Sequence, residues 1–216
     1  MKKLIIIFYF LILSCSTTKL NKIESENLKL EFTEMHKIDQ IAAEAKPNGQ
    51  FKNYPNENWN KFKDSVFTKH KNRIENLFNK YGYLGIKELG KSGSNDFWLF
   101  VQHCDKFPEF QKNVLKSLKK EAKKGNANLD NYAYLLDRVN ANGGEKQSFG
   151  TQVDYRVNGQ AKPKNGLIDS LNVDKRRNEY GLKPLKDYLN QMTEMHFEMN
   201  KDYFAKKGII KPNLYN

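Results

Sequence analysis

The chain has 216 residues, 38% of them hydrophobic and 29% charged, which is enough for one substantial core and makes a single domain the expectation. Lysine and arginine outnumber aspartate and glutamate by 37 to 25, and such a basic surplus favours anionic partners such as lipid headgroups, glycans or nucleic acids. Because the lysines are spread along the chain without a basic stripe or a binding motif, they indicate a solvated surface, and nucleic acid is excluded from the expected partners.

The first 15 residues have the composition of a bacterial signal peptide. Lys2 and Lys3 precede an apolar stretch, residues 4–13, and a small residue stands before Cys15. Ten apolar residues cannot cross a bilayer, because a spanning helix needs about 20. The ending ILSC resembles the lipobox of bacterial lipoproteins, which implies cleavage before Cys15, a lipid on its thiol and, since no Asp follows, attachment to the outer membrane. The alternatives are an ordinary secreted protein cleaved nearby and a retained anchor.

The chain after the signal peptide divides into two parts. Residues 16–27 are polar and have no apolar repeat, which predicts a short flexible tether. One helical domain is expected over residues 28–216, held at the cell envelope through the lipid on Cys15.

The first predicted helix carries an acid on its apolar face. Leu28, Phe32, Met35, Asp39 and Ala42 recur at spacings of three and four, so they share one face. A buried carboxylate is costly unless it is paired or protonated. Asp39 is therefore either a structural cap or ion-pair partner, or a general acid or base.

The second predicted helix carries a histidine on its apolar face. Its apolar positions run from Trp59 to Tyr81 at helical spacing and stop at a glycine. His70 lies on this face and is expected to be a hydrogen-bonded core residue. After an irregular segment to Gly93, Ser94 is the expected N-cap of the next helix.

That next helix contains the run FWLFVQHCD, residues 97–105. Five consecutive apolar residues place hydrophobes on every side of the helix, which predicts a central, buried one. Its end brings Gln102 and His103 into the interior, where His103 is either an acid–base group, an anion-binding group or a helix cap. Cys104 has no intramolecular disulfide partner once Cys15 is lipidated, and we expect a small buried hydrophobe rather than a nucleophile.

The rest of the chain predicts further helices and one hairpin. Apolar stripes begin at Phe110 and Tyr132, two short extended runs flank Asn158-Gly159, and Pro184 can start a terminal helix. The terminal helix is expected to bury a Met-rich face, which comprises Leu185, Tyr188, Leu189, Met192, Met195, His196 and Met199. The expected fold class is mainly α, a single helical domain of about six helices with one small β-hairpin.

Arginine is rare in this lysine-rich chain. Four of its five arginines cluster in the second half of the chain, namely Arg138, Arg156, Arg176 and Arg177. Because the planar guanidinium holds a carboxylate or phosphate through two parallel hydrogen bonds, we expect at least one of them to face a cavity. Acids close to them in sequence offer structural pairing instead: Asp137, Asp154 and Asp174.

An ordered set of short motifs resembles an uncharacterised bacterial family. The motifs are DQ at 39–40, WLFVQHCD at 98–105 followed by FQ at 110–111, AYLLDRV at 133–139, GEKQSFGTQ at 144–152 and VDKRRNEYGLKPL at 173–185. The family is a domain of unknown function found in secreted and lipid-anchored proteins, and the resemblance covers about residues 28–190. It implies no activity but a shared polar set: Asp39, Gln40, Gln102, His103, Asp105, Asp137, Arg138, Gln147, Gly150, Thr151, Gln152, Asp174 and Arg177. The chain departs from the family pattern at Phe149, where Tyr is expected, and at Cys104, where a small residue is usual.

Familiar catalytic and metal signatures are absent from the sequence. It contains no HExxH, CxxC or GxSxG motif and no Gly-rich phosphate loop, so neither a metal nor a cofactor is expected. The residues favour a site assembled from separate helices, with His103 as acid or base, Asp39 or Asp137 as its orienting carboxylate, and Arg138 or Arg177 holding an anion. The other candidate ligand-binding residues are Gln40, Gln102, Asp105, Gln147, Thr151 and Gln152.

Three functions fit this pattern. The first is a lipid-anchored envelope protein whose polar pocket binds a small anionic or glycan-like ligand, with hydrolysis as one outcome. The second is a non-catalytic envelope protein in which the same residues form a buried network. The third is a basic module that binds anionic membrane surfaces. The sequence leaves open whether the chain is an enzyme.

Overall fold

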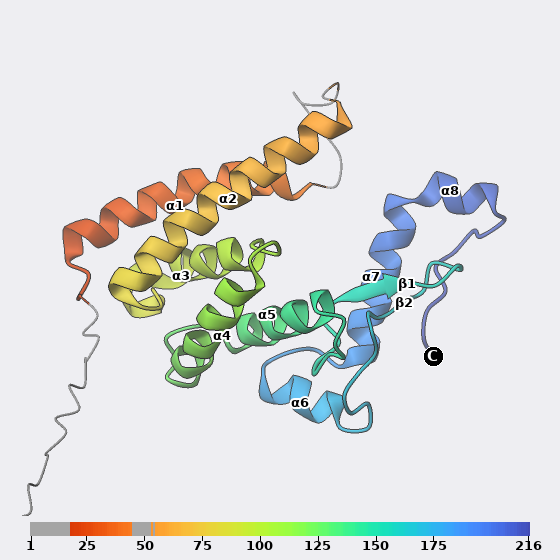
Figure 1. Ribbon diagram of the computed structural model, residues 1–216. Coiled ribbons are helices and arrows are strands. Elements are labelled where there is room, and N and C mark those ends of the chain that lie inside the picture. Colours follow the sequence, from red (N-terminus) through yellow and green to blue (C-terminus); the bar gives the residue numbers. More distant parts are fainter. Residues whose placement is uncertain (1–17, 45–52, 54) are drawn as a thin grey trace, which may run out of the picture.

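The computed structural model describes residues 18–44, 53 and 55–216, and the expected signal peptide and lipidated Cys15 lie outside these residues (Figure 1). The described part contains eight helices and one two-stranded antiparallel sheet, which confirms the mainly helical class, although about six helices were expected. The helices are α1 (Lys22–Ala43), α2 (Asn56–Tyr81), α3 (Ile86–Gln102), α4 (Pro108–Lys123), α5 (Leu129–Asn142), α6 (Val173–Glu179), α7 (Leu185–Met199) and α8 (Lys201–Lys206). None of these described helices is long and apolar enough to span a bilayer.

Helix α1 begins six residues before the expected start of the domain. The Asn21 side chain accepts a hydrogen bond from the Glu24 backbone, and the Glu24 carboxylate accepts one from the Asn21 backbone. This reciprocal capping box satisfies two free amides at the helix start. Residues 22–27, which the sequence assigns to the tether, are therefore helical.

Helix α3 starts earlier than the predicted N-cap at Ser94. The Glu88 carboxylate accepts a hydrogen bond from the Gly85 amide at the start of the helix. Gly90 has a φ of 71°, so the helical segment bends there before it continues through Ser94, which is buried. Only glycine adopts this conformation at little cost. The glycines that indicated an irregular segment thus mark a kink within a helix.

The first three helices pack around α3. Contacts at Ser25–Glu88, His36–Asp96 and Asp39–His103 show that α1 and α3 run in the same direction. Helix α2 runs antiparallel to α1, because Arg73 pairs with Glu31 while Tyr81 bonds Glu24. Three histidine–aspartate contacts therefore lie within or beside this three-helix layer.

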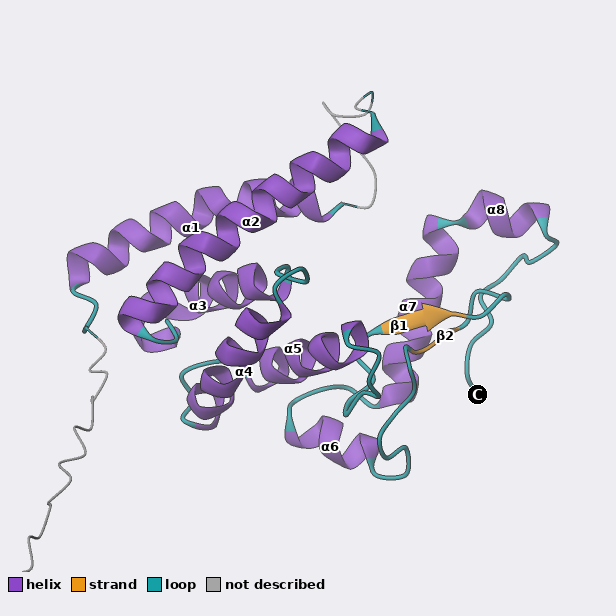
Figure 2. Cartoon of the chain, viewed as in Figure 1, coloured by secondary structure: helices purple, strands orange, loops and turns teal. Residues whose placement is uncertain are grey.

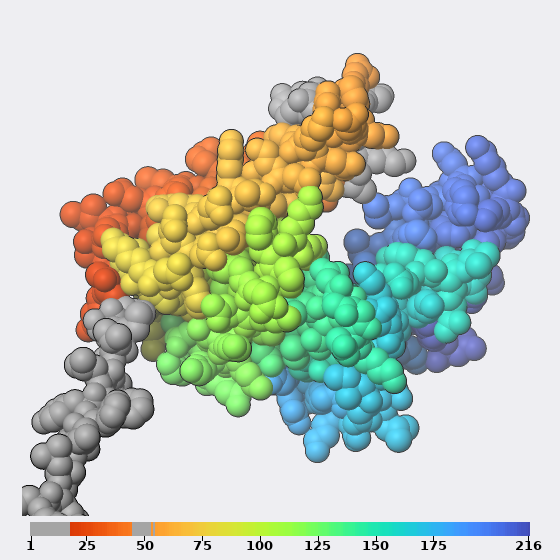
Figure 3. Space-filling model, viewed as in Figure 1, coloured from red at the N-terminus to blue at the C-terminus, as the bar shows by residue number. Residues whose placement is uncertain are grey.

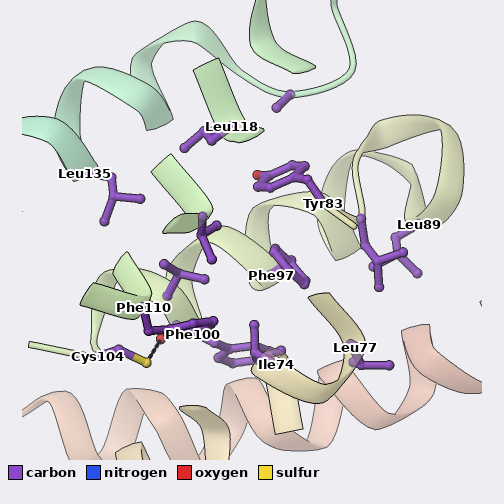
Figure 4. Close-up of a cluster of buried hydrophobic side chains, with 14 of the residues drawn as sticks. Ile74, Leu77, Tyr83, Leu89, Phe97, Phe100, Cys104, Phe110, Leu118 and Leu135 are labelled. Carbon is purple, nitrogen blue, oxygen red and sulfur yellow. Dashed lines mark hydrogen bonds between the residues drawn. The ribbon is translucent and has the colours of Figure 1, made fainter. Parts of the chain in front are cut away.

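The predicted central position of the FWLFVQ run is confirmed. Phe97, Phe100 and Val101 are completely buried, and the ring of Phe32 packs edge-on against Phe100 with centroids 5.4 Å apart. Figure 4 shows Phe97 and Phe100 between side chains of the surrounding helices, including Ile74. Helices α4 and α5 complete the core with Leu118 and Leu135, among others.

The predicted hairpin about Asn158-Gly159 is also confirmed. Strands β1 (Val153–Tyr155) and β2 (Ala161–Pro163) form an antiparallel hairpin (Figure 2). Asp154 lies opposite Lys162. Gly159 has a φ of 81°, and a Cβ at this position would lie 2.7 Å from the Phe204 ring. The turn therefore needs glycine both for its backbone and for its contact with α8.

The expected Met-rich core face of α7 is wrong. The buried residues of α7 are Leu189, Thr193 and Phe197, whereas Met195 and Met199 are exposed. Helix α7 packs against the hairpin, α6 and α8, and the blue C-terminal part of the chain that contains it lies at the edge of the molecule (Figures 1 and 3). A periodic apolar pattern gives the face of a helix but not the size of the surface that covers it.

Candidate active site

Three helices bring two histidines to one carboxylate. Asp39 of α1 is completely buried. Its Oδ2 lies 2.7 Å from Nδ1 of His103, which caps the end of α3, and its Oδ1 lies 3.2 Å from Nδ1 of His70 in α2. The expected Asp39–His103 pair is thus present. The core histidine His70 binds the other oxygen of the same carboxylate.

The surroundings keep Asp39 ionised. Burial by itself would raise the pKa of Asp39, but hydrogen bonds and charge from His103 and His70 outweigh it and hold the pKa below its ordinary value. Both imidazoles also contact aromatic rings, His103 with Phe67 at 5.3 Å and His70 with Phe100 at 5.0 Å between centroids. The carboxylate and both imidazoles are consequently held in fixed orientations.

His103 lies on the wall of a pocket of about 380 Å³. The pocket is lined by Ala43, Lys63, Asp64, Phe67, Thr68, His103, Asp105, Lys106, Phe107 and Arg138. The His103 side chain is 15% exposed, whereas Asp39 behind it is sealed from solvent. An imidazole that faces a pocket with a buried carboxylate behind it is an arrangement that can support acid–base chemistry.

Arg138 faces the same pocket and meets Asp105, not its sequence neighbour Asp137. Its Nε and Nη2 donate to the two carboxylate oxygens of Asp105 at 2.8 and 2.7 Å. Asn142 donates to the same carboxylate at 2.9 Å. An arginine therefore does line a cavity, as expected, but two of its hydrogen-bond donors already bind Asp105.

The glutamines near this pocket have different positions. Gln40 is exposed, and its Nε2 donates to Asp39 Oδ2 at 3.3 Å. Gln102 is buried and is not among the lining residues, and its Oε1 has no hydrogen-bond partner among the described residues. Gln111 donates to the backbone oxygens of Val101 and Gln102 and so fixes the end of α3 beside His103.

Asp137 belongs to a second network, away from the pocket lining. It is completely buried and accepts hydrogen bonds from the backbone amides of Ser148, Phe149 and Thr151 and from the Thr151 hydroxyl. Burial raises the pKa of Asp137 even though these donors favour the charged form. Asp137 organises a loop and makes no contact with His103.

The other predicted ligand-binding residues stabilise the same loop. Gln147 donates to the carbonyls of Gln152 and Lys164 and accepts from the Gln152 amide. Arg177 is almost completely buried, donates to the Phe149 and Lys183 carbonyls, and lies over the Tyr188 ring. Gln147, Thr151, Gln152 and Arg177 thus lie in the loop network and do not line the pocket beside His103.

Cys104 has the predicted role of a small buried side chain. Its thiol donates to the Phe100 carbonyl, which Figure 4 marks as a dashed line. Burial raises the pKa of Cys104 to about 12, so the reactive thiolate is disfavoured at neutral pH. This environment is unlike that of a catalytic cysteine.

Sequence reasoning missed several pocket residues. Lys63, Phe67 and Thr68 lie within α2, and their spacing of four and five residues places them on the side of that helix that faces the end of α3. His70 is the signal that could have located them. It lies seven residues after Lys63 and three after Phe67, which places these side chains on neighbouring parts of one face of α2. Among the described residues, no three His, Cys, Asp or Glu side chains are arranged to hold a metal ion together.

Comparison with known proteins identifies a family for this chain. A search of curated proteins and a search of solved structures found no match. The model of a family of unknown function, DUF6624, matches residues 26–200, which include every residue of both buried networks. The chain therefore belongs to the DUF6624 family, a family of unknown function.

Proposed function

We propose that the chain is a lipid-anchored envelope protein whose pocket binds a small anionic or glycan-like ligand, and that His103 is the acid–base group acting on it. One observation carries this proposal: the imidazole on the pocket wall is held at 2.7 Å by a buried, ionised carboxylate. Such a pair orients the imidazole and stabilises its protonated form.

The charges around the pocket support an anionic group on the ligand. Of its charged lining residues, three are cations and two are acids. Lys106 is paired with Asp64 and Arg138 with Asp105. Among the described residues Lys63 donates to a backbone carbonyl, that of Glu44, and pairs with no acid, so its positive charge is available to a ligand.

The apolar lining supports a ring-shaped ligand. Phe67 and Phe107 both line the pocket, and Phe67 also packs against His103. The apolar face of a sugar ring can pack on such aromatic rings while its hydroxyls reach polar groups. The combined features favour a sugar or another small ring that carries one negative charge.

The geometry supports hydrolysis as the reaction. Nε2 of His103 accepts a proton from water while the water oxygen attacks an electrophilic carbon of the ligand. The same nitrogen then returns the proton to the leaving oxygen, so that the imidazole is neutral again at the end of the cycle. Asp39 offsets the positive charge of His103 between the two steps.

A second candidate, a non-catalytic structural role, is favoured by His70. This residue is almost completely buried and shares Asp39 with His103, so the cluster also ties three helices together. The first candidate predicts that a ligand binds beside His103, whereas the structural role predicts no ligand there.

NMR titration tests the ligand-binding proposal. Inorganic phosphate and glucuronate, a sugar that carries a carboxylate, are added to the chain while the imidazole signals are followed. We expect saturable shifts at His103 and none at His36, which pairs with Asp96 at 2.8 Å but does not line the pocket. Absence of a saturable shift at His103 with both probes would overturn the anionic and sugar ligand class.

Hydrolysis is tested separately with p-nitrophenyl acetate. We expect the His103→Asn variant to lose turnover and the matched His36→Asn variant to keep it, because each histidine pairs with a buried aspartate but of the two His103 alone lines the described pocket. Equal turnover in both variants would contradict the proposed acid–base role.

The lipid anchor has its own test. The Cys15→Ser change removes the thiol that the proposal places on the lipid, so the protein is expected to move from the membrane fraction to the soluble fraction of cells. Mass spectrometry of the membrane-extracted protein checks the acyl mass on Cys15. Unchanged membrane association of Cys15→Ser would contradict this anchor.

A further inference from the structure

We infer that His70 is a positioning residue for the Asp39–His103 pair, and that both imidazoles carry their hydrogen on Nδ1, which leaves Nε2 of His103 as the proton acceptor on the pocket wall. The assignment of hydrogens follows from the described contacts, and the use of that acceptor rests on the proposed function. His70 acts only through Asp39.

The contacts determine which nitrogen carries the hydrogen. Both histidines reach Asp39 through Nδ1, one to each carboxylate oxygen. An ionised carboxylate can only accept, so each Nδ1 must be the donor. A neutral imidazole that donates from Nδ1 has an unprotonated Nε2. The Asp39 contact therefore selects the tautomer of His103 that can take a proton from a ligand or a water.

His70 supplies the second constraint that fixes the carboxylate. Without it, the described hydrogen bonds to Asp39 would come from His103 and Gln40, both at Oδ2. The torsion that turns a carboxylate about its Cβ–Cγ bond is broad, so donors on one oxygen leave the plane weakly defined. A donor on Oδ1 holds the plane in place and keeps Oδ2 directed at His103.

His70 has no direct route to a ligand. Its side chain is 7% exposed, it is absent from the pocket lining, and its ring packs against Phe100. Any effect of His70 on the pocket must therefore pass through Asp39. This separates a positioning residue from one that touches the ligand.

The test uses nitrogen-15 NMR of the histidine side chains at pH 8, where unperturbed imidazoles are neutral. In the unsubstituted chain, we expect His70 and His103 each to show a protonated Nδ1 and an unprotonated Nε2. In His70→Phe, which keeps an aromatic ring but removes the donor, we expect His103 to become a mixture of both tautomers. In His70→Asn, an amide donor lies near the place of Nδ1, and we expect the single tautomer of His103 to return.

Two outcomes would overturn the inference. One is an unprotonated Nδ1 on His70 in the unsubstituted chain, a measurement that does not depend on whether any variant folds. The other is an unchanged single tautomer of His103 in a folded His70→Phe variant, which would leave His70 with a purely structural role. Neither readout uses a ligand, so the tautomer result stands or falls independently of the ligand titration.

Discussion

Asp39 and Asp137, two of the buried aspartates, have equal burial but different partners. Both are completely inaccessible to solvent. In the described part of the chain, Asp137 accepts from donors of the 148–151 loop, three of them backbone amides. Asp39 accepts from two imidazoles that come from different helices, and one of these imidazoles faces a pocket.

This difference distinguishes a carboxylate that stabilises a loop from one that the proposed function places in acid–base chemistry. Backbone amides do not titrate, so these donors keep one protonation state, and the Asp137 network serves to hold a loop. An imidazole nitrogen can accept and release a proton, so under the proposed function the Asp39 cluster exchanges protons with a ligand through His103. Burial and charge alone would not distinguish the two acids, whereas the identity of their donors does.

The largest effect should come from Asp137→Ala. The change leaves three backbone amides without their acceptor, those of Phe149 and Thr151 buried and that of Ser148 half-buried, and because an unsatisfied buried donor costs about 1 to 3 kcal/mol, we expect a loss of roughly 3 kcal/mol. Urea unfolding measures the free energy of unfolding. The control is Asp154→Ala, at an exposed position on β1. A loss below about 1 kcal/mol at Asp137 would show that the loop does not depend on this carboxylate.

A smaller but pH-dependent effect is expected for Asp39→Asn. Because the folded chain lowers the pKa of Asp39, its carboxylate stabilises the fold above the unfolded pKa of about 4, and this stabilisation is lost as the pH falls through the folded value. We expect a loss of about 2 kcal/mol at pH 7, in the range of hydrogen bonds to charged groups. Unfolding at pH 7 and pH 3 checks this.

The contradictory outcome for Asp39→Asn is a stability difference that stays constant between these two pH values. Such a result would mean that Asp39 does not gain its stabilisation as an ionised group. Asp137→Asn is the matched comparison, because burial raises the pKa of Asp137 rather than lowering it. The two variants should therefore differ in the direction of their pH dependence.

His103→Ala should cost less stability, because its side chain is partly open to the pocket. We expect a loss of about 1 kcal/mol, the typical net worth of one hydrogen bond, together with loss of ligand binding. A loss of about 3 to 5 kcal/mol, as for a broken buried pair, would instead favour the structural role. Thermal and urea unfolding, with His36→Ala as the control, measure the difference.

The smallest effect on stability is expected for Arg138→Gln. Its pair with Asp105 lies at the surface of the pocket, with side chains 26% and 41% exposed, and exposed pairs contribute about 0 to 1 kcal/mol. Calorimetry should show a nearly unchanged free energy of unfolding. Phosphate affinity should change if Arg138 contributes to the site, and an unchanged affinity would leave Lys63 and Lys106 as the cations of the lining.

Much of the fold could be predicted because the helices carry strong apolar repeats. Leu28, Phe32 and Ala42 of α1 are buried as their spacing indicates, and Asn158-Gly159 forms the turn of the hairpin. The start of α3 and the buried face of α7 could not be predicted. The start of α3 depends on a kink at Gly90. The buried face of α7 depends on which elements pack against that helix.

The sequence identified the main residues of the candidate site but not the contacts between them. An acid within an apolar stripe singled out Asp39, and the polar end of a buried helix singled out His103. Their contact arises from the parallel packing of α1 and α3, which no local pattern encodes. The same holds for Arg138, whose partner is Asp105, 33 positions away, rather than the adjacent Asp137.

The most direct test of the account is the reactivity of each histidine toward diethyl pyrocarbonate, read by mass spectrometry on the folded wild-type chain. The reagent modifies unprotonated imidazole nitrogens that solvent reaches. We predict modification of His103 through its pocket and of the half-exposed His36, while the buried His70 stays protected. A His103 as unreactive as His70 would contradict the claim that the Asp39–His103 pair serves an open site.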